Sequence, residues 1–324
     1  MATYKEIHGV KVQYRDSDAT AIEGDVWYNA STGLLKMYSA VGAWASGGNL
    51  NVGRAYGGCA GIQTACIYFT GGMNPGNTPK TENESYDGSS WTELADLSNG
   101  RGAVGSLGVQ TSAACVGGSE YPGSPTHVTD VEEWDGSSWS EGGDLPASKG
   151  GLRAAGTQTA GLAISGYQDD PVNTCFEYDG SSWTAGGNVN THHSDWALVS
   201  AGTQTAALVA GGAPGPTANT ETYDGSSWTE VNNLNTASGQ GGGGGTQTSA
   251  IAGGSQQAPT AKTESWDGTN WSELADISSA RYAMGGCAAD NTSALITSGS
   301  PAHPAPVATE EWSYATSIET VAFD

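Results

Sequence analysis

The chain has 324 residues and a formal net charge of −23, because 34 acidic side chains face only 11 basic ones. That charge repels nucleic acid and anionic membrane surfaces, which argues against either as a general partner. The 49 glycines and 11 tryptophans, with only 3 phenylalanines, match neither an ordinary helical protein nor a disordered one.

The chain begins MATYKEIHGVKVQYR, which contains no apolar run of the length that a signal peptide needs. No later stretch approaches the length of a membrane span. We therefore expect synthesis in the cytoplasm, no membrane insertion, and export only as part of a larger assembly.

Residues 24–44, GDVWYNASTGLLKMYSAVGAW, predict a β-meander. Its strands are expected at DVWYN, LLKMYS and AWAS, separated by the turns ASTG and AVG. With VKVQY in front, this segment offers four strands, enough for one complete small sheet.

From residue 44 onward a unit of 43 to 48 residues recurs six times. Each unit is marked by a tryptophan, followed five residues later by Asn or Asp and then at once by an aliphatic residue. A period of this length is typical of propeller blades. The marking residues are Trp44, Trp91, Trp139, Trp183, Trp228 and Trp271.

Each unit predicts a meander of four strands. Segments such as GAVGSLG and GQGGGGG are rich in Gly and Ala and suit an innermost strand crowded around an axis. Runs such as ACIYFTGG and AALVAGG predict an apolar second strand, because neighbouring blades cover both of its faces. The third strand ends at Tyr or Trp, Asp-Gly makes the hairpin turn, and the fourth strand begins with Trp.

This pattern resembles the kelch family of β-propellers over roughly residues 44–314. The likeness rests on the Gly-Gly pairs, the Tyr or Trp before Asp-Gly, the Trp beyond it, and a basic residue ten positions after that Trp. It departs where Ser165-Gly166 and Ser298-Gly299 replace Gly-Gly and where Ser238 replaces the basic residue. The last unit reads EEWSYATS, with no Asp-Gly and no following Trp.

Residues 24–44 resemble the short WYN…LK…Y…W modules of bacteriophage tail fibres, and their junction with kelch-like units is similar to kelch-repeat proteins of marine phages. We predict an all-β propeller of seven four-stranded blades. Residues 1–48 would form an atypical N-terminal blade and residues 49–324 six kelch-like repeats, with SIETVAF as the outer strand of the last blade. The alternative is six blades preceded by an N-terminal arm.

The loops after the Gly-Gly positions differ in length and chemistry, whereas the TQT and DGSS turns hardly change. In a four-stranded meander these loops share one end of the propeller, so they could act as recognition loops on a fixed frame. Drift of unconstrained surface loops is the alternative. The loops read MNPGNTPKT, SEYPGSPTHVTD, YQDDPVNT, APGPTANT, SQQAPTAKT and SPAHPAPVAT.

A basic residue stands ten positions after five of the six tryptophans, at the variable end of the predicted blades. One interpretation is a cationic collar that receives a sugar carboxylate or a sulfate. We favour the other, in which each side chain pairs with a carboxylate or carbonyl of its own or the next blade. The six positions hold Arg54, Arg101, Lys149, His193, Ser238 and Arg281.

The fourth unit is longer at this place, NTHHSDWALVSAGTQT, and Tyr56 and Tyr282 lie close behind the basic residues of the first and last units. Aromatic faces beside hydrogen-bonding groups suit a sugar, so we predict a glycan contact here. The residues that the fourth unit brings to the mouth are His192, His193, Asp195 and Trp196.

The sequence predicts no metal, cofactor or catalytic set. Adjacent strand residues such as His192 and His193 point to opposite faces, and no cysteine or carboxylate cluster accompanies them. No pair of carboxylates stands out as acid and base, so we expect no enzyme. Five cysteines stand singly among small or apolar residues and are expected to be free, buried thiols: Cys59, Cys66, Cys115, Cys175 and Cys287.

These features favour a non-enzymatic, virion-associated binding module of the tail-fibre or receptor-binding type, which recognises a host-surface glycan or protein through its variable loops. One alternative is a structural or decoration virion protein that binds other virion proteins, and another is a carbohydrate-active enzyme. Fibre proteins are often trimers, which suggests a homo-oligomer by analogy alone.

Overall fold

The computed structural model describes residues 12–18, 25–72, 79–120, 126–193, 198–212, 215–256, 260–300 and 306–321. All regular structure within these residues is β, with twenty-six strands and no helix. Accordingly, the described part of the chain has no helix that is long and apolar enough to cross a membrane.

Five sheets are antiparallel meanders, each built from four consecutive strands. In each of these blades the strands run in sequence order from the inside outwards. The first blade contains β4 (Gly58–Ile62), β5 (Ala65–Phe69), β6 (Asn83–Tyr86) and β7 (Trp91–Glu93). The second contains β8 (Gly105–Val109), β9 (Ser112–Val116), β10 (Val131–Trp134) and β11 (Trp139–Glu141), and the third contains β12 (Arg153–Thr157), β13 (Ala160–Ile164), β14 (Phe176–Tyr178) and β15 (Trp183–Ala185). The fourth contains β16 (Val199–Thr203), β17 (Ala206–Ala210), β18 (Thr220–Tyr223) and β19 (Trp228–Val231), and the fifth contains β20 (Gly242–Thr246), β21 (Ser249–Ser255), β22 (Thr260–Trp266) and β23 (Trp271–Glu273).

The sixth sheet combines strands from the two ends of the chain, in the order β1-β2-β3-β26-β25-β24. Its inner three strands come from the C-terminal part, and the strand beside them, β3, comes from the N-terminal part. The strands are β24 (Gly285–Asp290), β25 (Ser293–Thr297), β26 (Thr309–Thr320), β3 (Leu34–Ser46), β2 (Val26–Asn29) and β1 (Gln13–Arg15). β2 pairs antiparallel with β3, and β1 pairs parallel with β2.

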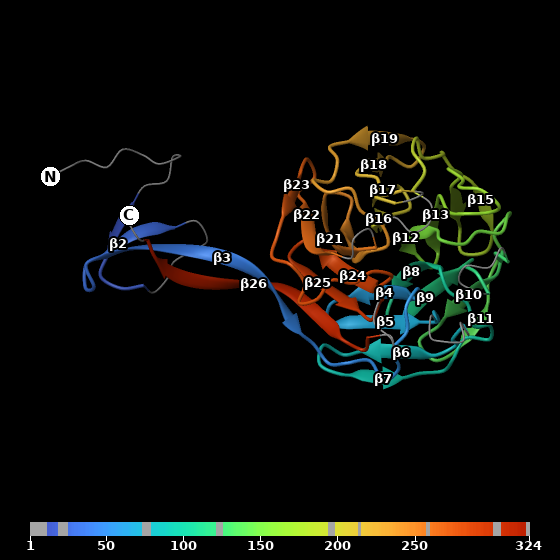
Figure 1. Cartoon of the computed structure of the whole chain (residues 1–324), viewed down its shortest axis with the longest axis horizontal. Helices are drawn as coiled ribbons and strands as arrows, with labels where there is room; N and C mark the ends of the chain where they lie inside the picture. The colour runs from blue at the N-terminus through green and yellow to red at the C-terminus, as the bar shows by residue number, and fades with distance from the viewer. Residues whose placement is uncertain are drawn as a thin grey trace. The chain divides into compact units, whose positions relative to one another are not determined.

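The six innermost strands form a closed ring, in which β4 contacts β8 and so on through β12, β16, β20 and β24, and β24 contacts β4 again. Figure 1 shows this ring face-on, with β7, β15 and β19 at the circumference. The structure therefore confirms the predicted all-β propeller.

Within the described residues the ring contains six blades, so the predicted count of seven is corrected in favour of its alternative. The described strands of the N-terminal segment belong to the sheet of the last blade, and β3 is the fourth strand of that blade. Trp44 of β3 packs on Trp312 of β26 with ring centroids 5.6 Å apart, as Trp91 packs on Tyr86 in the first blade. The last repeat has no second tryptophan after Trp312 because Trp44 from the N-terminal part takes that place. β3 also takes the place that was predicted for SIETVAF.

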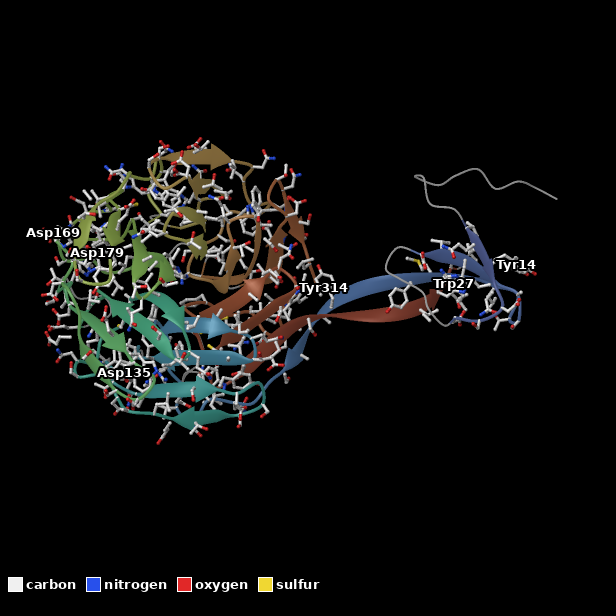
Figure 2. All side chains as sticks on the ribbon, turned by 180° about the vertical axis from the view of Figure 1, so that it is seen from behind. Tyr14, Trp27, Asp135, Asp169, Asp179 and Tyr314 are labelled. Carbon is white, nitrogen blue, oxygen red and sulfur yellow. The ribbon has the colours of Figure 1, made fainter. Side chains whose placement is uncertain are left out.

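The chain divides into two compact units, one of Met1–Ala43 with Ser313–Asp324 and one of Trp44–Trp312. We call the first the N-terminal unit. In it the Trp27 side chain is buried and its Nε1 donates a hydrogen bond to Asp18 at 3.0 Å. Tyr14 stacks on Tyr28 with ring centroids 5.5 Å apart, and Figure 2 labels Tyr14 and Trp27.

The TQT turns attach each blade to the blade before it. Gln110 Nε2 donates a 2.6 Å hydrogen bond to the carbonyl of Tyr86, the aromatic residue that precedes Asp-Gly in the first blade. Gln63 makes the equivalent bond to Trp312 and so joins the first blade to the last. The repetition of these turns therefore has a structural cause. The remaining bonds run from Gln158 to Trp134, Gln204 to Tyr178, Gln247 to Tyr223 and Asn291 to Trp266.

Close backbone packing at the axis explains the glycine-rich inner strands. A Cβ added at Gly244 would lie 2.8 Å from the backbone nitrogen of Ala288, and one at Gly286 would lie 2.2 Å from that of Gly243. Side chains therefore do not fit where β20 meets β24, which confirms GQGGGGG as an innermost strand.

Ring closure by Trp44 can be tested through stability. Trp44→Ala should lower the free energy of unfolding by about 3 kcal/mol, because it uncovers Trp312 and removes the 3.0 Å bond from Trp44 Nε1 to Thr263 Oγ1. Denaturant titration measures this loss. The control is Tyr14→Ala, an exposed aromatic of the N-terminal unit, which should change stability by less than about 0.5 kcal/mol. Equal losses for the two variants would contradict closure through Trp44.

The Asp-Gly turns are self-contained hydrogen-bonded structures. Asp87 Oδ1 accepts the N–H groups of Ser90 and Ser89 at 2.8 and 2.9 Å, and Gly88 has a φ of 92°, which favours glycine. Bonds from the Ser90 backbone and the Ser89 hydroxyl lower the pKa of Asp87 to about 2. The pKa values of the equivalent Asp135, Asp179 and Asp224 are also lowered to about 2 by their turn serines. Figure 2 labels Asp135 and Asp179.

These four carboxyl groups predict an acid-dependent loss of stability. Their folded pKa of about 2 lies below the ordinary value of 3.8, so between these values the unfolded chain binds more protons than the folded chain. Their contribution should be complete above pH 3.8 and should disappear as the pH falls through about 2. Replacing all four with Asn, which keeps an acceptor oxygen but cannot ionise, should flatten thermal-unfolding profiles over this range. An unchanged profile would assign the acid dependence to other carboxyls.

Candidate functional site

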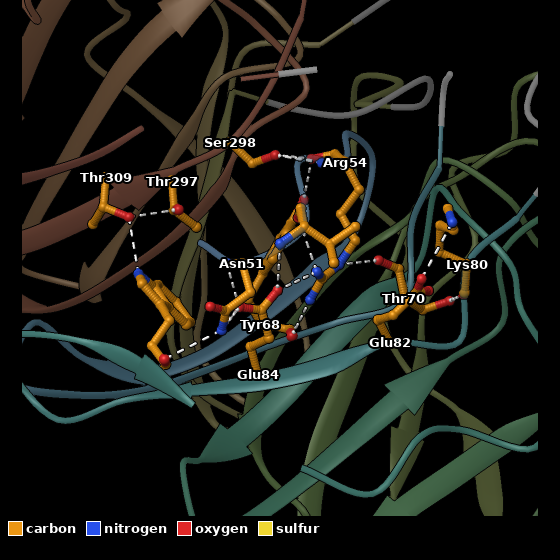
Figure 3. Close-up of polar contacts among 12 residues, drawn as sticks. Asn51, Arg54, Tyr68, Thr70, Lys80, Glu82, Glu84, Thr297, Ser298 and Thr309 are labelled. Carbon is orange, nitrogen blue, oxygen red and sulfur yellow. Dashed lines mark hydrogen bonds and ion pairs between the residues drawn. The ribbon is translucent and has the colours of Figure 1, made fainter. Parts of the chain in front are cut away.

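We call the propeller end that carries the connections between second and third strands the loop rim, and the opposite end the turn rim. Near the loop rim of the first blade, Arg54 is fully buried and its Nη1 lies 2.6 Å from Oε1 of the equally buried Glu84. Arg54 Nε and Nη2 donate to the carbonyls of Thr70 and Tyr68 at 3.0 and 2.8 Å, as Figure 3 shows. Every nitrogen of the guanidinium therefore has a hydrogen-bond partner inside its own blade.

The same buried pairing recurs in three other blades. Arg101 pairs with Glu132 at 2.6 Å, His193 Nε2 lies 3.2 Å from Glu221, and Arg281 pairs with Glu310. The interpretation of the repeated cations as a ligand-binding collar is thereby corrected, because buried side chains that are paired within a blade present no surface to a ligand. The buried basic residues are Arg54, Arg101, Lys149, His193 and Arg281.

The third blade lacks the glutamate and compensates for its loss. Phe176 stands at that position, and Lys149 Nζ lies 4.9 Å from the centre of its ring. Lys149 also donates to the carbonyls of Ser165 and Thr174 at 2.8 and 2.5 Å, and burial lowers the pKa of Lys149 to about 8. The cation is held by a ring and two carbonyls instead of a carboxylate.

The third blade also compensates for the missing glutamate at the position after the aliphatic residue that recurs in every repeat. In the first blade Asn51 at that position donates its backbone N–H and its side-chain amide to Glu84 Oε2 at 2.8 and 2.9 Å. The third blade, which has no glutamate, carries Pro146 there, and proline has no N–H to satisfy. Sequence comparison of the repeats could have revealed this linkage between proline and phenylalanine.

The predicted glycan contact in the fourth blade is only partly described. His193 is buried, with Nδ1 2.6 Å from the carbonyl of Gly211, whereas the adjacent His192 is exposed. Asp195 and Trp196 lie outside the described residues. A sugar contact by His192 therefore remains a prediction, and His193 is assigned to the interior of its blade.

Tyr56 and Tyr282 pack against Ala55 and Ala283, with Tyr56 buried and Tyr282 half-buried. Tyr56 has a φ of 65°, and its N–H donates to the carbonyl of Ala283 at 3.0 Å. Ala103 then donates to Tyr56, and Gly151 to Ala103, so backbone hydrogen bonds pass from blade to blade. Tyr56 is therefore part of the scaffold that joins the blades. This series of backbone hydrogen bonds could not be predicted from the sequence.

A central channel of about 150 Å³ is lined by the innermost strands of all six blades. Among the described residues that line it, Arg153 carries a charge, and its Nη2 donates to the carbonyl of Gly241 at 2.8 Å. Burial lowers the pKa of Arg153 to about 10. Arg153 was not among the predicted site residues, although an arginine among the small residues of GGLRAAG is unusual in this chain. The channel is smaller than the roughly 300–1,000 Å³ typical of organic-ligand pockets, so it suits water or a small ion.

Loops of neighbouring blades meet on the loop rim. Tyr167, which begins the third-blade loop, contacts His127 of the second-blade loop with ring centroids 5.8 Å apart. Tyr167 also exchanges backbone hydrogen bonds with Gly150 at 2.7 and 2.9 Å. Asp169 and Asp170 at the tip of the same loop are exposed, and Figure 2 labels Asp169. The loop rim therefore carries an aromatic pair and, on one of the same two loops, two exposed carboxylates.

Within the described residues, one group of potential metal ligands lies close enough to hold an ion, namely Cys59, Cys66 and Cys287. The prediction of free, buried thiols is confirmed, because all five cysteines are buried and unbridged. Their convergence was not predicted.

No protein-family model and no curated protein matches this sequence. Among solved structures, one titled "Structure of YjhT" is similar to this chain with a TM-score of 0.64, covering 83% of this chain and 99% of that chain at 14% sequence identity. At this identity the likeness supports the β-propeller fold alone.

The buried pair in the first blade gives a test by double substitution. Arg54→Met should lower the free energy of unfolding by about 3–5 kcal/mol, because Glu84 would stay buried without its cation. Arg54→Met combined with Glu84→Gln should cost less than the sum of the two single changes. Lys262→Met, which breaks the exposed pair with Glu273, should cost under about 1 kcal/mol in the same denaturant titrations. Additive losses at Arg54 and Glu84 would contradict a coupled buried pair.

Proposed function

We propose that this chain is a non-enzymatic binding module, carried on a phage tail fibre or capsid surface, that recognises a host-surface glycan or protein through its loop rim. The observation that carries the proposal is that the repeated polar residues are satisfied inside the frame. The loops that connect second and third strands, by contrast, differ in sequence from blade to blade.

The turn rim illustrates this division. Its glutamines bind the preceding blade, and its aspartates bind their own turns, so these residues repeat because the frame needs them. In the loops of the opposite rim, the described residues share backbone hydrogen bonds at the loop bases, whereas their side chains differ from blade to blade. Loops of differing chemistry on a fixed scaffold are a common way to build recognition surfaces.

The third-blade loop supports a polar ligand. Tyr167 offers a ring beside His127, and Asp169 and Asp170 offer hydrogen-bond acceptors at the exposed tip. Aromatic faces next to acceptors match the apolar face and hydroxyl rim of a sugar.

The N-terminal unit supports attachment to a particle. Six of the eight exposed large apolar side chains in the described chain belong to it: Val12, Tyr14, Tyr28, Leu34, Tyr314 and Ile318. Exposed apolar groups gathered in one small unit are typical of a protein contact. This observation also favours the second candidate function, a decoration protein that binds only other virion proteins.

Binding to an array of bacterial surface polysaccharides tests the proposal. The intact chain should bind at least one polysaccharide, and Asp169→Ala with Asp170→Ala, or Tyr167→Ala, should weaken binding about tenfold by removing contacts at the loop rim. Apparent affinities from immobilised-glycan titrations give the measurement.

The control is Val109→Thr on the turn rim, where Val109 is exposed and three other repeats carry threonine. It should leave binding unchanged. Binding that survives every loop variant would refute the loop rim as the site. Release of polysaccharide fragments would favour the enzyme alternative, and binding to virion proteins but to no host surface would favour the decoration protein.

A further inference from the structure

Three cysteines converge where the first and last blades meet. Cys59 lies on β4, Cys66 on β5 and Cys287 on β24, and their sulfur atoms all lie within 4.8 Å of one another. The Sγ atoms of Cys59 and Cys66 are 3.0 Å apart. All three side chains are buried, at 8%, 0% and 4% exposure. Residues separated by more than two hundred positions thus form one cluster of sulfur atoms.

The position of Cys66 does not require sulfur. In the first blade Cys66 pairs with Gly61, the last residue but one of the inner strand. The equivalent residues of the other blades are Ala113, Gly161, Ala207, Ala250 and Ala294. Because alanine fills this position in four other blades, packing alone does not account for a thiol at Cys66.

The geometry suits a thiophilic metal ion. Zinc–sulfur bonds of about 2.3 Å place sulfur atoms roughly 3.8–4.0 Å apart around one ion, so Cys59 and Cys66 would separate by about 1 Å. Thiolates select Zn²⁺ and Cu(I) over hard cations. Three thiolates leave a net charge of about −1 with Zn²⁺ but −2 with Cu(I), and burial penalises the larger charge.

The site has a route to solvent. Cys59 and Cys287 both line the central channel of about 150 Å³, which could admit the ion and a water molecule for a fourth ligand position. Because thiolates and not thiols bind the ion, binding must displace the protons of the three thiols.

We propose that Cys59, Cys66 and Cys287 form a three-thiolate site for Zn²⁺ that bridges the first and last blades, with its remaining position facing the channel. The site could not be predicted from cysteine spacing, because Cys287 lies in the last repeat and Cys59 and Cys66 lie in the first. A bound ion would connect β24 to β4 and β5 and so secure the closure of the ring.

Metal titration of the whole chain, reduced and stripped with chelator, tests the site. One equivalent of Zn²⁺ should bind, with release of protons from the thiols and a rise in the thermal midpoint. Co²⁺ as a probe should give an intense sulfur-to-metal charge-transfer band. Mg²⁺ should neither bind stoichiometrically nor raise the thermal midpoint.

The chain offers matched variants. Cys66→Ala copies the residue of other blades and should weaken Zn²⁺ binding at least about 100-fold, as should Cys287→Ser. Cys115→Ser and Cys175→Ser alter buried cysteines outside the cluster and should keep full binding. If Cys287→Ser fails to fold, the alanine variant still decides.

Four results would overturn the proposal. The first is no stoichiometric Zn²⁺ binding, and the second is equal binding by Cys66→Ala and the intact chain. The third is stoichiometric Cu(I) uptake without Zn²⁺ uptake. Loss of two hydrogen masses from a Cys59–Cys66 peptide in chain purified without oxidant would also overturn it, because a disulfide would remove two of the ligands.

Discussion

Closure of the ring is the constraint on which the rest of this structure depends. A sheet in a propeller is covered on both faces by its neighbours, so every blade needs two neighbours, and the last must meet the first. The chain satisfies this by giving its last blade a fourth strand from the N-terminal part, so that Trp44 completes the aromatic pair with Trp312. The N-terminal segment thereby serves as part of the propeller and as part of a separate unit.

Internal satisfaction of polar groups explains why so much of the sequence repeats. Buried charges destabilise a fold unless they are paired, and here the glutamate of one segment meets the basic residue of another together with backbone N–H groups. The third blade shows that the set behaves as a whole, since the carboxylate is replaced by Phe176 while Pro146 removes a donor and Lys149 replaces arginine. A carboxylate lost without these adjustments would leave a buried cation and a buried N–H group unpaired.

The repeat made the fold predictable, since period, Asp-Gly turns and glycine-rich segments each have one structural meaning. The blade count was not predictable, because the second tryptophan of the last blade, Trp44, comes from the other end of the chain. The order of residues along the chain does not reveal such a pairing. The candidate site was harder still. Repetition of a basic residue suited both a collar and internal pairing, and only the burial of Arg54 and its equivalents separates them. The thiol cluster depends on the neighbourhood of β4 and β24, which no spacing between cysteines encodes.

Closure is also the least local step of assembly. Tyr86 and Trp91 are five residues apart, whereas Trp44 and Trp312 are 268 apart, so by chain entropy alone the last pair costs about 3.5 kcal/mol more to form. The seam carries contacts that offset this cost: Gln63 bonds the Trp312 carbonyl, Trp91 Nε1 donates to Thr309, and the Tyr86 hydroxyl donates to Glu311 at 2.6 Å. Because this boundary must form across the whole chain, added cohesion is most useful there, and it is at this boundary that three thiols converge.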